Sequence, residues 1–222
     1  MDYTQRSTVE RGTESVLATH KVLRNTYLLL AMTLLFSAAV AAVSALYALP
    51  HPGVLITLGA YFGLLFLTTK FRDSNLSLLF VFALTGFLGY TLGPLINAYM
   101  NLPRGGELIA LALGTTGVTF LGLSAYALRS RRDFSFLGNF LFVGILVAFC
   151  LGLAAIFFSL PALSLAVSGM FVLLMCGLIL FQTDQIIRGG ETNYVMATVT
   201  LYVALYNLFT SLLHLFGVMG DD

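Results

Sequence analysis

The residues of this chain that could take part in chemistry are few, and most lie inside long apolar runs. Cys150 and Cys176 lie within such runs, which favours buried free thiols over a disulfide. The three histidines, His20, His51 and His214, are far apart and have no cysteine partners. The sequence therefore predicts neither a metal site nor a bound cofactor.

A serine enzyme is the catalytic alternative that the sequence raises. The segment "GLSA", Gly122 to Ala125, loosely matches the GxSG serine motif of intramembrane proteases, and His214 lies on a later apolar segment. Ala125 replaces the final glycine of that motif, and the polar residues near His214 include no carboxylate that would orient an imidazole. Serine is also common in membrane helices as a packing residue. We therefore expect no catalytic residues and no enzymatic activity.

The composition of the chain predicts what kind of structure surrounds these residues. The chain has 222 residues, of which 59% are hydrophobic and 9% charged, with a mean hydropathy of +0.94. Soluble domains carry about a quarter charged residues, so this chain is expected to use lipid as its solvent. The net charge of +1 gives no basic field that would indicate a nucleic-acid partner.

Seven apolar segments are long enough to be membrane helices, and none shows the alternation typical of barrel strands. They are Thr26–Ala48, Gly53–Thr68, Leu76–Ala98, Leu108–Leu128, Ser135–Phe158, Ala162–Thr183 and Tyr194–Val218. The second is the shortest. The sequence predicts an all-α, seven-transmembrane-helix bundle over residues 26–218, with a poorly ordered cytoplasmic tail over 1–25 and a short periplasmic end over 219–222.

Orientation follows from the basic residues in the loops. Ten of the eleven Lys and Arg residues fall on one side of the predicted bundle, and only Arg104 falls on the other. Because loops rich in Lys and Arg stay in the cytoplasm, the N-terminus is predicted to be cytoplasmic and the end with Asp221 and Asp222 periplasmic.

The polar side chains within the predicted spans are uncharged amides, hydroxyls and an imidazole, and no Lys, Arg, Asp or Glu lies deep in any span. This argues against an ion-coupled pump or transporter. Tyr202 and Tyr206 are four residues apart and share one face of the last segment, so with Asn207 they either line a pocket or pack between helices. Glycines in "GFLGYTLGP" and "GTTGVTFLG" are expected to allow close helix packing within one molecule rather than dimerisation.

Five blocks of the sequence together carry a resemblance to a known family. They are "HKVLRNTY" (20–27), "TGFLGYTLGP" (85–94), "RDFSFLGNFL" (132–141), "GGETNY" (189–194) and "TLYVALYNLF" (200–209). In these blocks and their spacing, over nearly the whole chain, the protein resembles the Bax inhibitor-1 family. The resemblance implies a seven-helix protein of the bacterial inner membrane. It further implies binding to the membrane-anchored protease FtsH, with that protease's membrane-associated regulators as further possible partners, and degradation by FtsH.

A second functional class comes from channel-like members of that family, which the resemblance describes as proton-sensitive calcium leaks. In them two aspartates on the last two helices share a proton and form a latch. By the register of the family those positions fall on Gln182 and Ala204, neither of which can titrate. A basic residue that engages the latch would fall near Lys70 or Arg72.

The stretch around Asp184 contains the carboxylate nearest to the first latch position. Asp184 is two residues past Gln182, so we expect it on another helix face, at the water boundary. The pair Gly189–Gly190 suits a helix stop, and "FQTDQIIRGGETNY" is interpreted as a helix end followed by a cytoplasmic turn.

Overall fold

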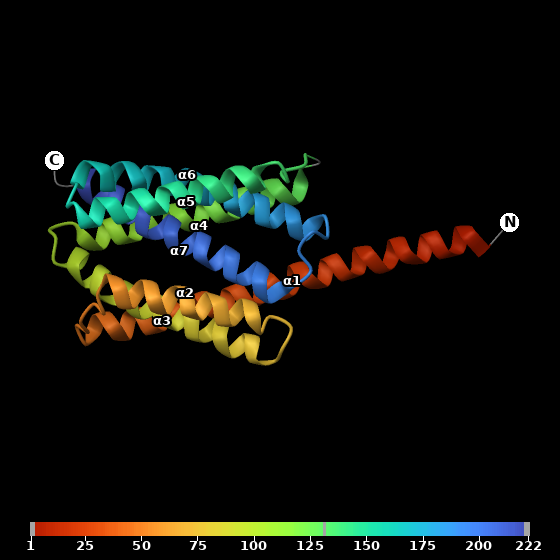
Figure 1. The fold of residues 1–222 in the computed structure, drawn as a ribbon, viewed down its shortest axis with the longest axis horizontal. Coiled ribbons are helices and arrows are strands. Elements are labelled where there is room, and N and C mark those ends of the chain that lie inside the picture. Colours follow the sequence, from red (N-terminus) through yellow and green to blue (C-terminus); the bar gives the residue numbers. More distant parts are fainter. Residues whose placement is uncertain (1–2, 131, 220–222) are drawn as a thin grey trace.

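Seven α-helices make up the part of the chain that the structure, a computed structural model, describes (Figure 1). Backbone is described for residues 3–130 and 132–219, and side chains for 19–130 and 132–218. The helices are α1 (Tyr3–Leu46), α2 (Val54–Lys70), α3 (Leu76–Met100), α4 (Gly105–Arg129), α5 (Leu137–Phe157), α6 (Pro161–Ile187) and α7 (Tyr194–Met219). The prediction of an all-α bundle is confirmed.

Six of these helices are long and apolar enough to cross a membrane. The remaining one, α2, has 17 residues, which matches the expectation that the second span is the shortest. At a rise of about 1.5 Å per residue it covers roughly 26 Å, the short end of what a bilayer core of about 30 Å requires. The outer surface of the bundle exposes large apolar side chains, among them Leu55, Val118 and Leu173, as expected for contact with lipid.

Most helix boundaries lie within three residues of the sequence prediction, and two differ by more. Helix α1 already begins at Tyr3, so the backbone is helical where the sequence indicated a poorly ordered tail over residues 1–25. Once a span is helical, each added residue extends the helix without a new nucleation cost, and the polar composition did not reveal this. Helix α6 continues to Ile187, one turn past the predicted end at Thr183. Of the predicted periplasmic end over 219–222, only the backbone of Met219 is described. Arg131 lies outside the described residues.

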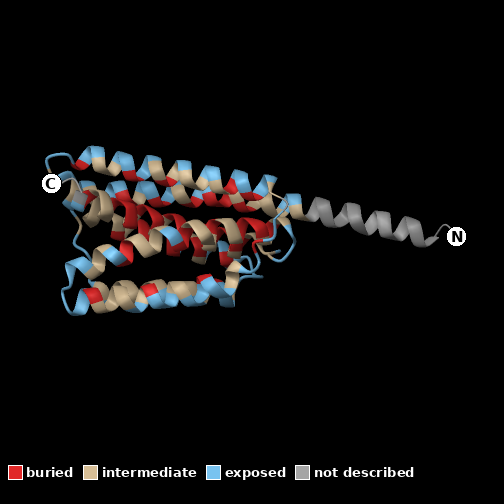
Figure 2. Cartoon of the chain, turned by 90° about the horizontal axis from the view of Figure 1, so that it is seen from above, coloured by how far each residue is buried: buried red, intermediate tan, exposed pale blue. Residues whose placement is uncertain are grey.

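Helix α7 passes between two groups of helices, with α1–α3 on one side and α4–α6 on the other (Figure 1). It packs against α1, α3, α4 and α6, whereas α2 packs along α3. Figure 2 shows the buried residues gathered on the central helices, and α7 contributes many of them, including Leu201, Leu208 and Leu213. Helix α7 therefore makes contact with both groups, which also touch each other where α3 meets α4 and where α1 meets α6.

Close contact between α1 and α3 depends on glycines of the third segment. A Cβ atom added at Gly89 would overlap the backbone of Ser37, and one added at Gly93 would overlap Ser44. This confirms that the third segment's glycines serve internal packing. For the glycines of "GTTGVTFLG" the expectation of close packing is wrong, because a Cβ at Gly114, Gly117 or Gly122 would meet nothing within 4 Å.

Candidate functional site

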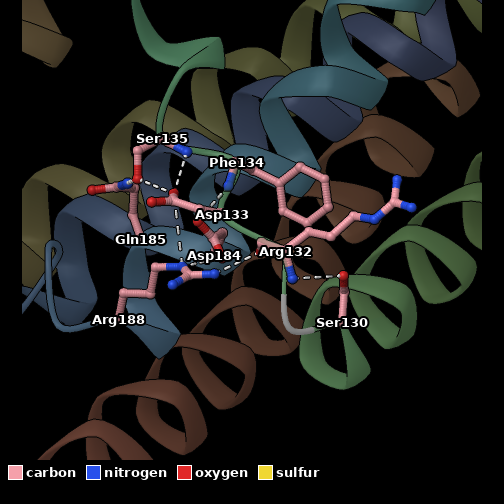
Figure 3. A network of polar contacts seen from close by, with 8 residues as sticks. All are labelled: Ser130, Arg132, Asp133, Phe134, Ser135, Asp184, Gln185 and Arg188. Carbon is pink, nitrogen blue, oxygen red and sulfur yellow. Dashed lines mark hydrogen bonds and ion pairs between the residues drawn. The ribbon is translucent and has the colours of Figure 1, made fainter.

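The end of the bundle where most basic residues gather holds a network of polar contacts around Asp184 (Figure 3). Asp184 lies in the last turn of α6 and its side chain is 3% exposed. One carboxylate oxygen accepts a hydrogen bond from Arg188 Nε at 2.8 Å. The other accepts one from the backbone N–H of Phe134 at 3.0 Å. Asp184 therefore joins the end of α6 to the loop between α4 and α5.

Arg188 completes the connection to that loop. Its Nη2 donates to the carbonyl oxygen of Arg132 at 2.6 Å, and its Nε lies 3.8 Å from a carboxylate oxygen of Asp133. The hydrogen bond with Asp184 raises the pKa of Arg188 above its usual range, so this guanidinium stays charged. Hydrogen bonds from the hydroxyl and the backbone N–H of Ser135, together with the nearby Arg188 charge, lower the pKa of Asp133.

The expectation that Asp184 lies at the water boundary is wrong. Because α6 extends one turn further, Asp184 remains helical and is covered by the α4–α5 loop, and its charge is compensated locally by Arg188. The glycine stop after this turn is confirmed. Gly189 has a φ of +74°, and the N–H groups of Gly189 and Gly190 donate to the carbonyls of Ile186 and Gln185 at 3.2 and 2.8 Å. This is the Schellman arrangement of a helix C-terminus.

A second contact ties the turn between α6 and α7 to the loop between α2 and α3. The side-chain amide of Asn193 donates to the carbonyl of Arg72 at 3.1 Å and to the carboxylate of Asp73 at 3.2 Å. Its oxygen accepts the backbone N–H groups of Val195 and Met196, which caps the start of α7. Three inter-helix connections are therefore cross-linked at this end of the bundle.

The two positions assigned to the latch are both buried. Gln182 is 6% exposed on α6 and Ala204 is 0% exposed on α7, and the two helices pack against each other. The side-chain nitrogen of Gln182 has no hydrogen-bond partner within the described residues. Of the basic candidates for the latch, Lys70 lies over the ring of Phe71 and Arg72 pairs with Asp73 at 3.4 Å.

A row of hydroxyl groups on α7 faces the α1–α3 group. Thr198, Tyr202 and Tyr206 are each four residues apart, so they share one helix face. Thr198 donates to the carbonyl of Thr26 at 3.2 Å. The Tyr202 hydroxyl lies 2.5 Å from the Ser37 hydroxyl and 3.2 Å from the Thr85 carbonyl, and the Tyr206 hydroxyl lies 2.9 Å from that of Thr91. We call these three residues the hydroxyl row.

Two cavities flank the hydroxyl row. One, of about 600 Å³, lies between α1 and α4, and Tyr202 and Tyr206 form part of its floor. The other, of about 390 Å³, is lined by Tyr61, Tyr206 and Asn207 among mainly apolar residues of α2, α5, α6 and α7. The amide nitrogen of Asn207 donates to Val203 within its own helix at 2.8 Å. The structure thus places Tyr202, Tyr206 and Asn207 on cavity walls, and Tyr206 borders both cavities.

The serine and histidine weighed as an enzyme site are not joined. His214 Nδ1 lies 2.8 Å from the hydroxyl of Ser168 on α6, and Ser168 in turn donates to the carbonyl of Ser164 at 3.1 Å. Ser124 is buried on α4, and its hydroxyl has no partner among the described side chains. The Ser168–His214 contact was missed because two polar residues on separate apolar segments carry no spacing signal.

Comparison with known proteins decides the family. The family model described as inhibitor of apoptosis-promoting Bax1 matches residues 19–221. The chain belongs to the Bax inhibitor-1 family. The match covers all the residues of the network, the hydroxyl row and both cavities.

Several bacterial relatives in this family cover almost the whole chain. The Escherichia coli protein named modulator of FtsH protease YccA is 51% identical over 208 residues, which is 94% of each chain. A Pseudomonas aeruginosa relative is 52% identical over 201 residues, 90% of each chain. A Vibrio cholerae membrane protein is 43% identical over 221 residues, covering 99% of this chain and 97% of its own. An Escherichia coli relative is also named an inner membrane protein, which agrees with the six long apolar helices found here.

Proposed function

We propose that this protein binds the membrane-anchored protease FtsH, modulates its activity and is itself degraded by it. The observation that carries the proposal is the 51% identity, over 94% of both chains, to a relative named modulator of FtsH protease. The proposed role is that of a binding partner with no catalytic step of its own. His214 pairs with Ser168 on α6, so the serine–histidine pair of Ser124 and His214 that the sequence raised is not assembled.

The test uses the full chain in its native membrane. A tagged chain should co-purify with FtsH from gently solubilised membranes, and its overproduction should slow FtsH-dependent turnover of another membrane substrate. A matched control is another seven-helix membrane protein expressed at the same level. Equal FtsH recovery with that control would contradict specific binding.

Degradation and orientation have their own measurements. With the N-terminus proposed to be cytoplasmic, residues 2–19 precede the first span and are proposed as the segment that the protease grips. Deleting them should lengthen the half-life in cells without impairing membrane insertion, and an unchanged half-life would contradict this role. A reporter active only outside the cytoplasm, fused after Asp222, should be active if the chain crosses the membrane seven times.

The calcium-leak alternative has less support from the residues. A proton-sharing latch needs two carboxylates, and Gln182 and Ala204 supply none. Asp184 is the nearby carboxylate of α6, and its partners are Arg188 and Phe134. We therefore keep protease modulation as the proposed function.

A further inference from the structure

A cleft with basic walls lies at the end of the bundle where α1 enters the membrane. It has a volume of about 640 Å³ and is lined by His20, Lys21, Leu23, Arg24, Tyr27 and Leu128. Lys21 and Arg24 are exposed, and no hydrogen bond or ion pair joins either to another side chain within residues 19–130 and 132–218. Two cations beside an apolar wall at the membrane surface suit an anionic amphiphile.

The apolar cavity of about 600 Å³ lies further along α1 and α4, and residues of α3 and α7 also line it. Its walls include Leu34 and Ala38 of α1 and Gly117 and Phe120 of α4. The rings of Tyr27, which lines the basic cleft, and Phe120, which lines the cavity, are 5.8 Å apart. This aromatic pair therefore lies between the basic cleft and the apolar cavity, and we call the cleft and the cavity together the α1–α4 groove.

The distance from the cations to the near end of the apolar cavity matches one leaflet of a bilayer. Ten residues separate Arg24 from Leu34, which at about 1.5 Å per residue is roughly 15 Å. Half of a hydrocarbon core of about 30 Å is the same length. A lipid whose phosphate lies at Arg24 would thus have its acyl chain reach the level of Leu34, at the near end of the apolar cavity, so that the end of the chain enters the cavity.

We propose that the α1–α4 groove binds one anionic phospholipid. Lys21 and Arg24 bind the phosphate, and an acyl chain runs past Tyr27 and Phe120 into the cavity beside Gly117. Charge complementarity and the match of depth favour a lipid over a second copy of the chain, which would have to bring its own anionic group to the basic cleft. The proposal does not depend on FtsH as a partner.

The first test removes charge. The full chain, purified in neutral detergent, is titrated with phosphatidylglycerol or with phosphatidylcholine of the same acyl chains, and retained lipid is measured by native mass spectrometry. We expect preference for phosphatidylglycerol. Lys21→Gln with Arg24→Gln should weaken that binding by about fivefold per charge, roughly 30-fold in total. The single variants report on each charge separately if the double variant elutes as an aggregate.

The matched control is Lys70→Gln with Arg72→Gln, which removes the same charge from the same end of the bundle but outside the groove. This control should bind phosphatidylglycerol almost as the unmodified chain does. Equal loss in both double variants would mean that a diffuse field attracts the lipid, and it would overturn the site. Equal binding of the two lipids, or a dimer in place of a lipid complex, would overturn it as well.

The second test addresses the acyl chain. Gly117→Leu places a side chain in the cavity without a clash at Cβ, and Gly122→Leu is its control because Gly122 is equally unobstructed but does not line the groove. Gly117→Leu should weaken binding of a sixteen- or eighteen-carbon phosphatidylglycerol (roughly the length of one leaflet) and leave the dioctanoyl form unaffected. If the two substitutions weaken binding equally, the proposed path of the acyl chain is wrong. If inorganic phosphate binds with the affinity of the lipid, the acyl chain contributes nothing and the path is wrong as well.

Discussion

The substitution Asp184→Ala tests whether one buried carboxylate holds the α4–α5 loop in place. The change removes the acceptor of the Phe134 N–H at 3.0 Å and of Arg188 Nε at 2.8 Å. Hydrogen bonds to charged groups contribute about 1.5–3 kcal/mol, and the Asp184 side chain is 3% exposed, so the contact with Phe134 falls within this range. The partly exposed Arg188 side adds less, because water solvates that guanidinium once it is released.

The measurement is hydrogen–deuterium exchange of the loop. Losing about 2 kcal/mol of local stability should speed exchange of the Phe134 amide by roughly 30-fold. Protection in the middle of α7, at Leu208 for example, should change little, because that residue is packed in the core. Asp184→Asn should have a smaller effect, since one side-chain oxygen can still accept from Phe134.

Arg188→Ala is the companion variant, and it separates the two contacts. It leaves the Asp184–Phe134 hydrogen bond in place although it also removes the contact with the Arg132 carbonyl, so protection of the Phe134 amide itself should fall less than in Asp184→Ala. An unchanged Phe134 exchange rate in Asp184→Ala would refute the reasoning. So would a uniform loss of protection throughout the bundle, because that pattern would make Asp184 a general stability residue.

Three further predictions concern the bundle itself. Gly89→Leu should lower the thermal unfolding temperature in detergent strongly, since overpacking costs about 1–3 kcal/mol, whereas Gly114→Leu, at an open position, should leave it almost unchanged. Tyr202→Phe removes two hydrogen bonds between helices and should cost about 1 kcal/mol in unfolding from mixed micelles, and no loss would argue against the hydroxyl row. Calcium flux into vesicles carrying the unmodified chain should not depend on pH between about 6 and 8, whereas Gln182→Asp with Ala204→Asp should introduce such dependence, more than either single change.

Much of the architecture could be predicted because apolar length alone identifies membrane helices. The end of α6 could not, because "TDQII" is too polar to count as part of a span and yet remains helical up to Gly189. Burial of Asp184 depends on the α4–α5 loop, fifty residues away in sequence, folding back over it. A contact at that separation leaves no local pattern in the sequence. The environment of Asp184 was therefore predicted wrongly, although the helices themselves were predicted correctly.

For glycines and hydroxyl-bearing residues, the sequence indicated which of them share a helix face but not which face contacts another helix. The spacing of Tyr202 and Tyr206 correctly indicated one shared face, but Thr198 as the third member became evident only from its contact with Thr26. Gly89 and Gly114 both lie in glycine-containing segments, but a Cβ added at Gly89 would overlap α1, whereas one at Gly114 would meet nothing within 4 Å. Spacing defines a face, but which face meets a neighbour is decided by how all seven helices assemble.

The contacts of α7 with its neighbours bear on what could rearrange the two groups of helices. The described contacts that join α7 to α1 and α3 in the core are made by neutral hydroxyls, which keep their hydrogen bonds at any ordinary pH. At the basic end, the contact of Asp184 is made with Arg188, whose charge is also insensitive to ordinary pH. These hydrogen bonds between α7 and the α1–α3 group therefore do not depend on a charged pair, and we expect rearrangement of the two helix groups to follow the binding of a partner. This is the behaviour expected of a membrane protein that works by being bound, and it is consistent with the proposed association with a protease and with an anionic lipid in the α1–α4 groove.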